Sequence, residues 1–168
     1  MNHWLLKTEP SVFGIDDLER SPNRTTSWEG VRNYQARNML RDDMRKGDLA
    51  FFYHSSCAEP GIVAIAQIIR AGYPDASAWN PRSPYYDAKS LENKPLWYTV
   101  DVQLKQRLKQ PIPLTQLREH ADDELAELWL LRKGNRLSVM PVSEQHWRFI
   151  LSLTSSDPIT KTGARARP

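Results

Sequence analysis

Two apolar runs near the middle of the chain constrain its fold most strongly. The segment LAFFY occupies residues 49–53 and the segment IVAIAQII occupies residues 62–69, and the second is rich in β-branched side chains. Such short continuous apolar runs are typical of strands that are buried on both faces of a sheet. The polar segment HSSCAEPG separates them, which predicts a loop between two strands. The core is therefore expected to form around a central β-sheet.

Weaker patterns on either side predict the other elements. Further strands are expected at 4–6, 97–104 and 136–142, with another extended segment around Pro113, and residues 21–27 are expected to form a loop. Helices are expected at 16–19, from the N-cap Asn33 to a point before Gly47, after the cap Thr115, at 122–131 and after the cap Ser143. These elements do not alternate as strict βαβ units. They indicate an α+β domain with a mixed, barrel-like sheet.

The length of the chain fits one domain. With 168 residues, a single core can bury roughly 70% of the surface that the unfolded chain exposes. After residue 153 the apolar residues nearly vanish, while Lys161, Arg165 and Arg167 add positive charge. The expected organisation is one domain at 1–153, followed by a disordered basic tail at 154–168.

Charge and cysteine content narrow the class of protein. The 23 Lys and Arg residues against 20 Asp and Glu residues give a net charge of +3, which permits nucleic-acid binding without requiring it. Cys57 is the single cysteine, so no intramolecular disulfide can form. No apolar stretch approaches the roughly 20 residues that a membrane span needs, and the N-terminal segment lacks the pattern of a secretory signal. We expect a soluble cytoplasmic protein, or a nuclear one in a eukaryote, with no membrane partner.

The sequence carries none of the common catalytic or metal-binding motifs. It has no nucleophile elbow, no phosphate-binding glycine loop and no paired cysteines, and its four histidines lack ligand spacing. His54 and Cys57 lie three residues apart and offer a base beside a thiol, but a catalytic pair also needs an orienting group and an oxyanion site. An ordinary loop thiol beside a polar histidine is the favoured interpretation. We therefore expect no enzymatic activity, no catalytic residues, no cofactor and no metal.

The segment WEGVRNYQARNML at 28–40 favours binding over catalysis. A helix that starts near Asn33 directs free backbone N–H groups and the positive end of its dipole toward whatever lies in front of it. Arg32 and Arg37 can contact phosphates, and Trp28 offers a face for base stacking, which is worth roughly 1–3 kcal/mol per base. Asn33 both donates and accepts hydrogen bonds, which suits the edge of a heterocycle. The alternative is that Trp28 belongs to the core, Asn33 only caps the helix and the arginines are solvated.

Three other segments carry similar alternatives. Pro10 holds Glu9 extended, where its carboxylate can accept a hydrogen bond from an exocyclic amine such as cytosine N4, or can pair with an arginine. The triplet YHS at 53–55 ends a buried strand and lines a pocket at the rim of the sheet, or forms a hydrogen-bonded strand end. The long segment 73–94, with its prolines and aromatic residues, is typical of a functional surface.

Taken together, five segments resemble the EVE domain family: KTEP at 7–10, WEGVRNYQARN at 28–38, GDLAFFYHS at 47–55, YYDAKS at 85–90 and RLSVMPV at 136–142. They occur in order over about residues 2–153, and the pattern W-x-G-V-R-N followed by Y-H-S is specific. The resemblance implies a PUA-like fold, a small and partly closed β-barrel with short helices around it. That fold is related to the YTH and SRA-type readers of modified bases.

The resemblance also implies a function. Proteins of this superfamily hold a flipped, modified base in a pocket with aromatic walls, and flipping exposes the Watson–Crick edge at a cost of a few kcal/mol. The expected function is non-catalytic recognition of a modified base in nucleic acid, such as a 5-methylcytosine derivative in DNA. Trp28 would stack, Asn33 and Glu9 would recognise the base, and Arg32 and Arg37 would hold the backbone. The expected base-pocket and nucleic-acid-binding residues are Lys7, Glu9, Pro10, Trp28, Val31, Arg32, Asn33, Arg37, Tyr53, His54, Ser55, Trp79, Arg136 and Ser138.

Other hypotheses stay open at this point. The same pocket could bind modified RNA, because no side chain that senses a 2′-hydroxyl can be identified from the sequence. It could also belong to a small hydrolase or nucleobase-processing enzyme that uses Glu9, His54 or Cys57, or the segment 73–95 could dock another protein. The expected partner is nucleic acid, modified DNA or RNA, with an effector protein that the sequence does not identify. The expected state is a monomer.

Overall fold

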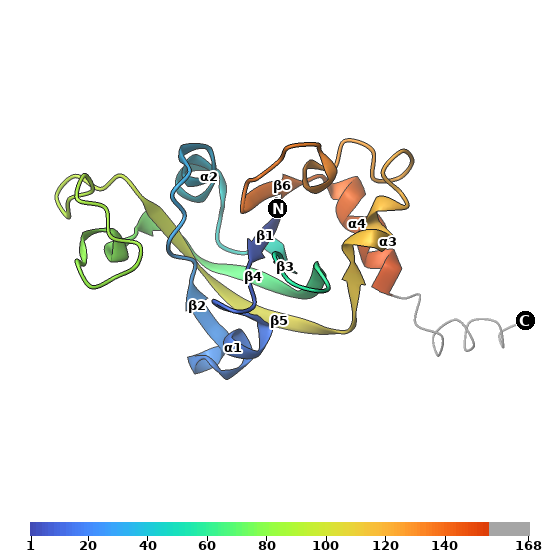
Figure 1. Ribbon diagram of the computed structural model, residues 1–168, viewed down its shortest axis with the longest axis horizontal. Coiled ribbons are helices and arrows are strands. Elements are labelled where there is room, and N and C mark those ends of the chain that lie inside the picture. Colours follow the sequence, from blue (N-terminus) through green and yellow to red (C-terminus); the bar gives the residue numbers. More distant parts are fainter. Residues whose placement is uncertain (155–168) are drawn as a thin grey trace, which may run out of the picture.

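Six strands form one mixed sheet in the computed structural model, which describes residues 1–154 (Figure 1). The strands are β1 (His3–Thr8), β2 (Thr25–Ser27), β3 (Leu49–His54), β4 (Gly61–Pro74), β5 (Tyr98–Pro113) and β6 (Val139–Val142). Their order across the sheet is β2-β5-β4-β3-β1-β6. β1 pairs with β3 in parallel, and the other pairings are antiparallel. β2 and β6 are edge strands, so the sheet is not closed, which agrees with the expected α+β fold and its partly closed barrel.

The two apolar runs form central strands because both of their faces are buried. Successive side chains of a strand point to opposite faces, so Phe52 packs into one cluster and Phe51 and Tyr53 pack into another. We call the cluster around Phe52 the first core and the cluster around Phe51 the second core. The first core also contains Trp28, and the second core contains Trp147, whose ring stacks on Phe51 at 3.9 Å between centroids.

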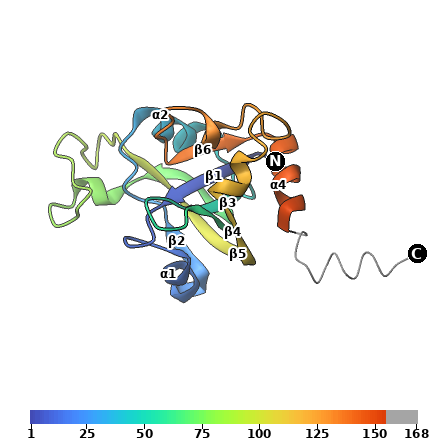
Figure 2. The same cartoon turned by 45° about the vertical axis from the view of Figure 1, so that its right-hand side comes forward.

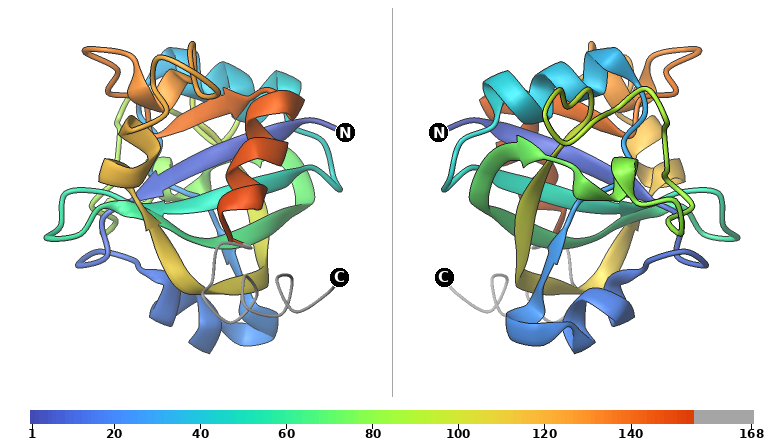
Figure 3. Two further views of the ribbon diagram at one scale, coloured as in Figure 1. Left: turned by 90° about the vertical axis from the view of Figure 1, so that its right-hand side faces the viewer. Right: turned by 90° about the vertical axis from the view of Figure 1, so that its left-hand side faces the viewer.

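Short helices cover the two faces of the sheet. They are α1 (Ile15–Arg20), α2 (Tyr34–Asn38), α3 (Leu114–Arg118) and α4 (Glu144–Thr154). α1 and α2 contribute buried side chains to the first core, whereas α3 and α4 contribute to the second. In Figures 2 and 3, α1 lies at the bottom of the view and α2 at the top, at opposite ends of the first core, and α4 lies across the face of the second core.

Four single-turn elements complete the described structure: η1 (Pro22–Arg24), η2 (Met39–Asp43), η3 (Ala76–Trp79) and η4 (Trp129–Leu131). η2 is a π-helical turn that follows α2 without a break. The helix expected after Asn33 therefore extends over 34–43. The segment between β4 and β5 forms a long loop that projects from one end of the sheet, on the left of Figure 1.

Several predicted elements differ from the structure. The helix predicted at 122–131 is wrong: Leu125 and Leu128 are buried, but the segment forms turns and η4. Glu127 has a φ of 70°, in the left-handed region, so no α-helix can continue through it. The predicted loop at 21–27 contains η1 and the edge strand β2, and the N-cap of α3 is Pro113 rather than Thr115.

The remaining sequence predictions are located as follows. The strand predicted at 97–104 and the extended segment around Pro113 belong to one long strand, β5, and the strand predicted at 136–142 begins at Val139. Ser143 caps α4 as predicted, because its Oγ accepts a hydrogen bond from His146 N at 3.1 Å. Within residues 1–154, no helix has the length and apolar character that crossing a bilayer requires. The tail predicted at 154–168 lies outside the described residues, apart from Thr154 at the end of α4.

Candidate nucleic-acid interface

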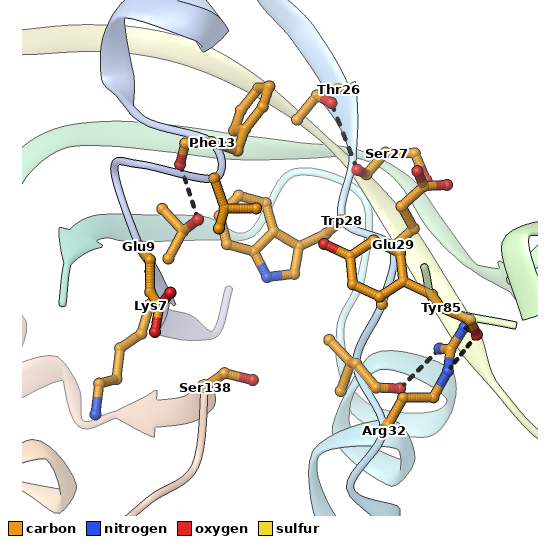
Figure 4. A pocket seen from close by; sticks show the side chains of 14 residues that line it. Lys7, Glu9, Phe13, Thr26, Ser27, Trp28, Glu29, Arg32, Tyr85 and Ser138 are labelled. Carbon is orange, nitrogen blue, oxygen red and sulfur yellow. Dashed lines mark hydrogen bonds between the residues drawn. The ribbon is translucent and has the colours of Figure 1, made fainter. Parts of the chain in front are cut away.

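A cavity of about 510 Å³ opens where the end of β1 meets the segment between β2 and α2 (Figure 4). Two more distant parts of the chain complete its wall, the loop between β4 and β5 and the residue before β6. The lining residues are Lys7, Thr8, Glu9, Val12, Phe13, Thr26, Ser27, Trp28, Glu29, Gly30, Val31, Arg32, Tyr85 and Ser138.

Lys7 contributes a half-buried ammonium group to this cavity. Lys7 N donates to Ser138 O at 2.8 Å, and this bond brings Ser138 beside the end of β1. Burial lowers the pKa of the Lys7 ammonium group, because the charged form loses hydration. Among residues 1–154, no carboxylate pairs with it. The lining of the cavity therefore includes a positively charged hydrogen-bond donor that has no ion-pair partner among residues 1–154.

Trp28 belongs to the first core and also reaches the cavity. Its side chain packs edge-on against Phe52 with ring centroids 5.6 Å apart, and the residue is 7% exposed. Trp28 N donates to Val100 O at 2.8 Å, which fixes the backbone beside the edge of the sheet. Figure 4 shows the indole nitrogen pointing into the open space above Ser138. No hydrogen bond of this nitrogen to another residue in 1–154 is present, so Trp28 offers an N–H donor to the cavity.

Gly30 allows Tyr85 to form the opposite wall. Gly30 has a φ of 88°, in the left-handed region that favours glycine. A Cβ atom at this position would lie 2.6 Å from Cε1 of Tyr85 and 2.7 Å from Cδ1 and Cζ. The Tyr85 ring therefore rests directly on the Gly30 backbone. Any larger residue at position 30 would displace this wall.

Arg32 and Asp75 join the two walls. Arg32 Nη1 lies 3.0 Å from Asp75 Oδ2, and the same oxygen accepts a hydrogen bond from Gly30 N at 2.9 Å. Arg32 also donates to Tyr85 O from Nη2 at 2.7 Å and from Nε at 3.1 Å. Burial alone would raise the pKa of Asp75, but hydrogen bonds from Ser77, Gly30 and Arg32 outweigh it and the pKa is lowered. Asp75 is therefore ionised where it holds the cavity together.

Glu29 adds a second carboxylate to the lining, in addition to that of Glu9. Burial, followed by the nearby Asp75 carboxylate, raises the pKa of Glu29, although Arg32 opposes the shift. Both carboxylates can accept hydrogen bonds when they are ionised. With Lys7 and the Trp28 N–H, the cavity thus presents donors and acceptors between apolar and aromatic walls.

Six of the residues predicted from the sequence line the cavity: Lys7, Glu9, Trp28, Val31, Arg32 and Ser138. Arg32 does so with its guanidinium group engaged by Asp75, Ser77 and Tyr85 O, so it shapes the wall and is not free to hold a phosphate. The structure places the other eight elsewhere: Pro10, Asn33, Arg37, Tyr53, His54, Ser55, Trp79 and Arg136.

Asn33 and Arg37 have roles within the protein. Asn33 is the N-cap of α2, since its Oδ1 accepts from Ala36 N at 3.0 Å. Arg37 donates to Leu96 O at 2.9 Å and lies over the ring of Tyr34. The alternative considered for this segment was a helix cap with solvated arginines. It describes Asn33, but Arg37 is engaged by Leu96 O and Tyr34 and is not simply solvated. α2 itself has only five residues before η2 begins.

The triplet at 53–55 does not line the cavity either. Tyr53 faces the second core, on the other side of the sheet. His54 Nε2 accepts a hydrogen bond from Ile15 N at 3.1 Å, and Ser55 N donates to Thr8 O at 2.9 Å. These contacts match the hydrogen-bonded strand end that was the alternative for this triplet.

Pro10, Trp79 and Arg136 lie near the cavity in sequence but outside its lining. Pro10 packs against Gly14, where a Cβ would meet Pro10 atoms at 3.3 Å. Trp79 ends η3 in the long loop, and Arg136 is exposed in the segment before β6.

The sequence interpretation missed eight lining residues: Thr8, Val12, Phe13, Thr26, Ser27, Glu29, Gly30 and Tyr85. Two of them have sequence features that could have identified them. Gly30 separates Glu29 from Val31 in a segment otherwise free of glycine, and such a position indicates a close backbone approach. Tyr85 belongs to the aromatic segment that was identified as a functional surface. The other six are ordinary residues whose contribution depends on the fold.

Comparisons with known proteins agree on one family. A model of the EVE domain matches residues 2–153. The chain is 44% identical to thymocyte nuclear protein 1 of Gallus gallus over 170 residues, which cover 93% of this chain and 70% of that protein. A crystal structure of a Pseudomonas putida protein is 48% identical with a TM-score of 0.85, and covers 90% of this chain and 99% of that chain.

A third similar protein was solved with a ligand. The structure of the human THYN1 protein in complex with 5-methylcytosine-containing DNA has a TM-score of 0.88 and 40% identity, and covers 94% of this chain and 100% of that chain. The family model spans almost all of the described residues, and the relatives share two fifths or more of their aligned residues with this sequence. The chain therefore belongs to the EVE domain family.

Proposed function

We propose that this protein is a non-catalytic module that binds DNA carrying a modified cytosine, with the base flipped out of the helix and held in the cavity. The observation that carries the proposal is the combination of a Lys7 ammonium group and a Trp28 N–H, both without a partner among residues 1–154, in a cavity with aromatic walls. The complex of the human THYN1 protein with 5-methylcytosine-containing DNA supports the choice of ligand.

The polar groups match the edge of cytosine. That edge presents one donor, the exocyclic amine N4, and two acceptors, N3 and O2. Glu9 is the acceptor for N4, and Lys7 and the Trp28 N–H are donors for the two acceptors. Lys7 has lost part of its hydration in the protein, so a ligand acceptor restores hydrogen bonds to a charge that burial destabilises.

The walls match the faces and the 5-position of the base. Tyr85 and the edge of Trp28 bound the cavity, and Phe13 and Val31 add apolar surface. A methyl group on the base gains free energy when such surface covers it, by about 0.8 kcal/mol for each buried carbon. Discrimination of 5-methylcytosine from cytosine by a contact of this kind is therefore modest unless the shape of the wall adds to it.

Exposed cations in the segments that lead to the cavity lining are candidates for contacts to phosphate. Lys133 and Arg136 lie in the segment that leads to Ser138, and Arg82 lies in the segment that leads to Tyr85. All three are exposed, and none forms an ion pair with another described residue. Phosphate contacts of this kind position a nucleic acid and make its affinity depend on salt. Lys133, Arg136 and Arg82 would thus make the phosphate contacts that were expected of Arg32 and Arg37.

An enzyme in the same cavity is the alternative class. It would use Glu9 as the base, because His54 accepts a backbone hydrogen bond outside the cavity and Cys57 does not line it. A nucleophile–base pair with an orienting group is the usual requirement for covalent catalysis. Glu9 has no such partner among the lining residues that the structure describes. A bound nucleic acid is therefore expected to be released unchanged, and any effect on it requires another protein.

The test is a titration of the protein with matched oligonucleotides that differ at one base. DNA and RNA versions each carry cytosine, 5-methylcytosine or 5-hydroxymethylcytosine, and each is measured at two salt concentrations. At least a tenfold preference for a modified DNA, about 1.4 kcal/mol, that survives added salt is expected. A stronger preference for modified RNA than for modified DNA would assign RNA as the ligand, and recovery of altered nucleotides would favour the enzyme. Equal, salt-sensitive binding to all of them would contradict the proposal.

A further inference from the structure

Val12 differs from every other residue that lines the cavity, because its apolar side chain is 63% exposed. Four other large apolar side chains within residues 1–154 are strongly exposed: Met1, Tyr34, Tyr86 and Leu91. None of these four lines the cavity. A single exposed apolar residue needs no explanation by itself. The position of Val12 at the mouth of the cavity, however, does need an explanation.

The turn that carries Val12 is held by hydrogen bonds. Val12 N and Phe13 N both donate to Glu9 O at 2.9 Å, and Thr8 Oγ1 donates to Phe13 O at 2.8 Å. Phe13 packs against the first core. The backbone therefore cannot turn Val12 inward without breaking these contacts, and the exposure of Val12 is a property of a fixed turn.

A fixed, exposed apolar side chain is suited to insertion between bases. Flipping a base out of a duplex leaves a gap, and the neighbouring bases lose their stacking partner. Proteins that deform DNA commonly fill such a gap with an apolar wedge. Valine is branched at Cβ and has few rotamers, so holding it in the gap costs little side-chain entropy.

We infer that Val12 is a wedge that enters the space vacated by the flipped base, and that the substrate is therefore double-stranded. This inference rests on the proposed function, since a wedge has a purpose only if a base is extruded. It adds the strandedness of the substrate and the residue that stabilises the distorted duplex. A single strand has no stack to repair, so it gains nothing from Val12.

Ion pairs and hydrogen bonds partly neutralise the carboxylates near Val12. Asp16 and Glu19 of α1 both pair with Arg107, at 2.7 Å and 2.5 Å. Asp17 accepts a hydrogen bond from Gly14 N at 2.8 Å and pairs with Arg20. Glu9 is the remaining carboxylate of this turn, and it lines the cavity, where it faces the base.

The experiment compares single-stranded and double-stranded forms of one oligonucleotide that contains a single 5-methylcytosine. A third form places a mismatch opposite the modified base, which lowers the cost of extruding it. The proteins are the wild type, Val12→Gly, Val12→Ile and the control Leu91→Gly. Leu91 is 51% exposed but lies outside the cavity lining. Thermal unfolding of each variant establishes that it is folded.

Val12→Gly is expected to weaken binding to the matched duplex about tenfold, because the unstacked neighbours are left uncovered. Its effect on the single strand is expected to stay under about twofold, and its effect on the mismatched duplex to lie between the two. Val12→Ile keeps an apolar wedge and is expected to retain the preference for the matched duplex over the single strand, and Leu91→Gly is expected to bind all three forms as the wild type does.

Two results would overturn the inference. Equal losses on single strand and duplex, or no loss on either, would exclude the wedge. The proposed function would stand in that case if the wild type still prefers the modified base. A wild type that does not distinguish 5-methylcytosine from cytosine in any form would overturn the proposed function, and the wedge with it.

Discussion

Arg32 and Asp75 form an ion pair at 3.0 Å that joins two segments 43 residues apart, with the Asp75 side chain only 1% exposed. The same carboxylate accepts from Gly30 N, and the same guanidinium group donates to Tyr85 O. This buried contact and the hydrogen bonds around it thus tie one wall of the cavity to the other. The contact determines the shape of the site without taking part in binding.

Removing one partner of this pair should destabilise the fold. Asp75→Ala is expected to lower the free energy of unfolding by about 3–5 kcal/mol, because it leaves the Arg32 charge partly buried without its partner. Urea unfolding measures this change. The control is Asp42→Ala, which removes an exposed ion pair with Arg41 at 2.7 Å and is expected to change stability little. Similar small losses for both variants would contradict the buried-pair interpretation.

Gly30→Ala should impair binding beyond its cost in backbone strain. A positive φ costs a non-glycine residue roughly 1–3 kcal/mol, and the new Cβ would also lie 2.6 Å from the Tyr85 ring. Gly134→Ala is the matched control, because Gly134 has a φ of 79° and no atom within 4 Å of the added Cβ. Gly30→Ala is expected to reduce the preference for the modified base, whereas Gly134→Ala is expected to retain it. Equal oligonucleotide binding by the two variants would show that Tyr85 is not a wall of the site.

Lys7→Met should change stability and binding in opposite directions. Burial lowers the pKa of the Lys7 ammonium group, because the charged form loses hydration when the protein folds. Methionine keeps the length of the side chain without the charge, and the variant is expected to be as stable as the wild type or more stable. Its affinity for modified DNA is expected to fall about tenfold, since a hydrogen bond to a charged group contributes roughly 1.5–3 kcal/mol. A variant that loses stability but retains affinity would assign Lys7 to the fold and remove it from the site.

The stability of the protein should depend on His54 at mildly acidic pH. Its Nε2 accepts from Ile15 N, which requires the neutral ring, and burial lowers the pKa of His54 below its ordinary value of 6.5. The folded pKa is therefore lower than the unfolded one. The stability that the neutral His54 ring contributes is fully present above pH 6.5, and it is lost as the pH falls through the folded pKa.

The measurement is urea unfolding of the wild type and His54→Gln from neutral pH downward. The stability difference between the two proteins is expected to shrink as the pH falls, because glutamine does not titrate. A difference that stays constant over this range would contradict the role of the neutral ring.

The sheet could be predicted from the sequence because its central strands carry their own signal. LAFFY and IVAIAQII are buried on both faces, so the apolar pattern is continuous and independent of distant contacts. The segment 122–131 shows the opposite case. Leu125 and Leu128 have helical spacing and are buried in the second core, but packing there is achieved by turns with Glu127 in the left-handed region. Tertiary contacts outweighed helix propensity in that segment.

The candidate site could be predicted only in part. Lys7, Glu9 and Trp28 lie in segments that the family pattern marks, and all three line the cavity. Tyr53 lies outside the cavity because strand alternation places it on the face opposite Phe52, and which face borders the cavity depends on the fold. Tyr85 could not have been placed from the sequence, since its position follows from Arg32 and the backbone of Gly30.

We propose that the cavity recognises a modified cytosine through the Trp28 N–H and its neighbours, and Trp28→Phe removes that donor. Phenylalanine keeps an aromatic ring in the first core and removes the N–H donor. Both proteins are titrated with matched duplexes that contain cytosine or 5-methylcytosine, and their thermal unfolding is compared. The wild type is expected to bind the modified duplex at least tenfold more tightly, and the variant to lose about fivefold in affinity, close to one hydrogen bond, while staying folded. Equal binding of the two duplexes by the wild type, or unchanged affinity of the folded variant, would contradict the account.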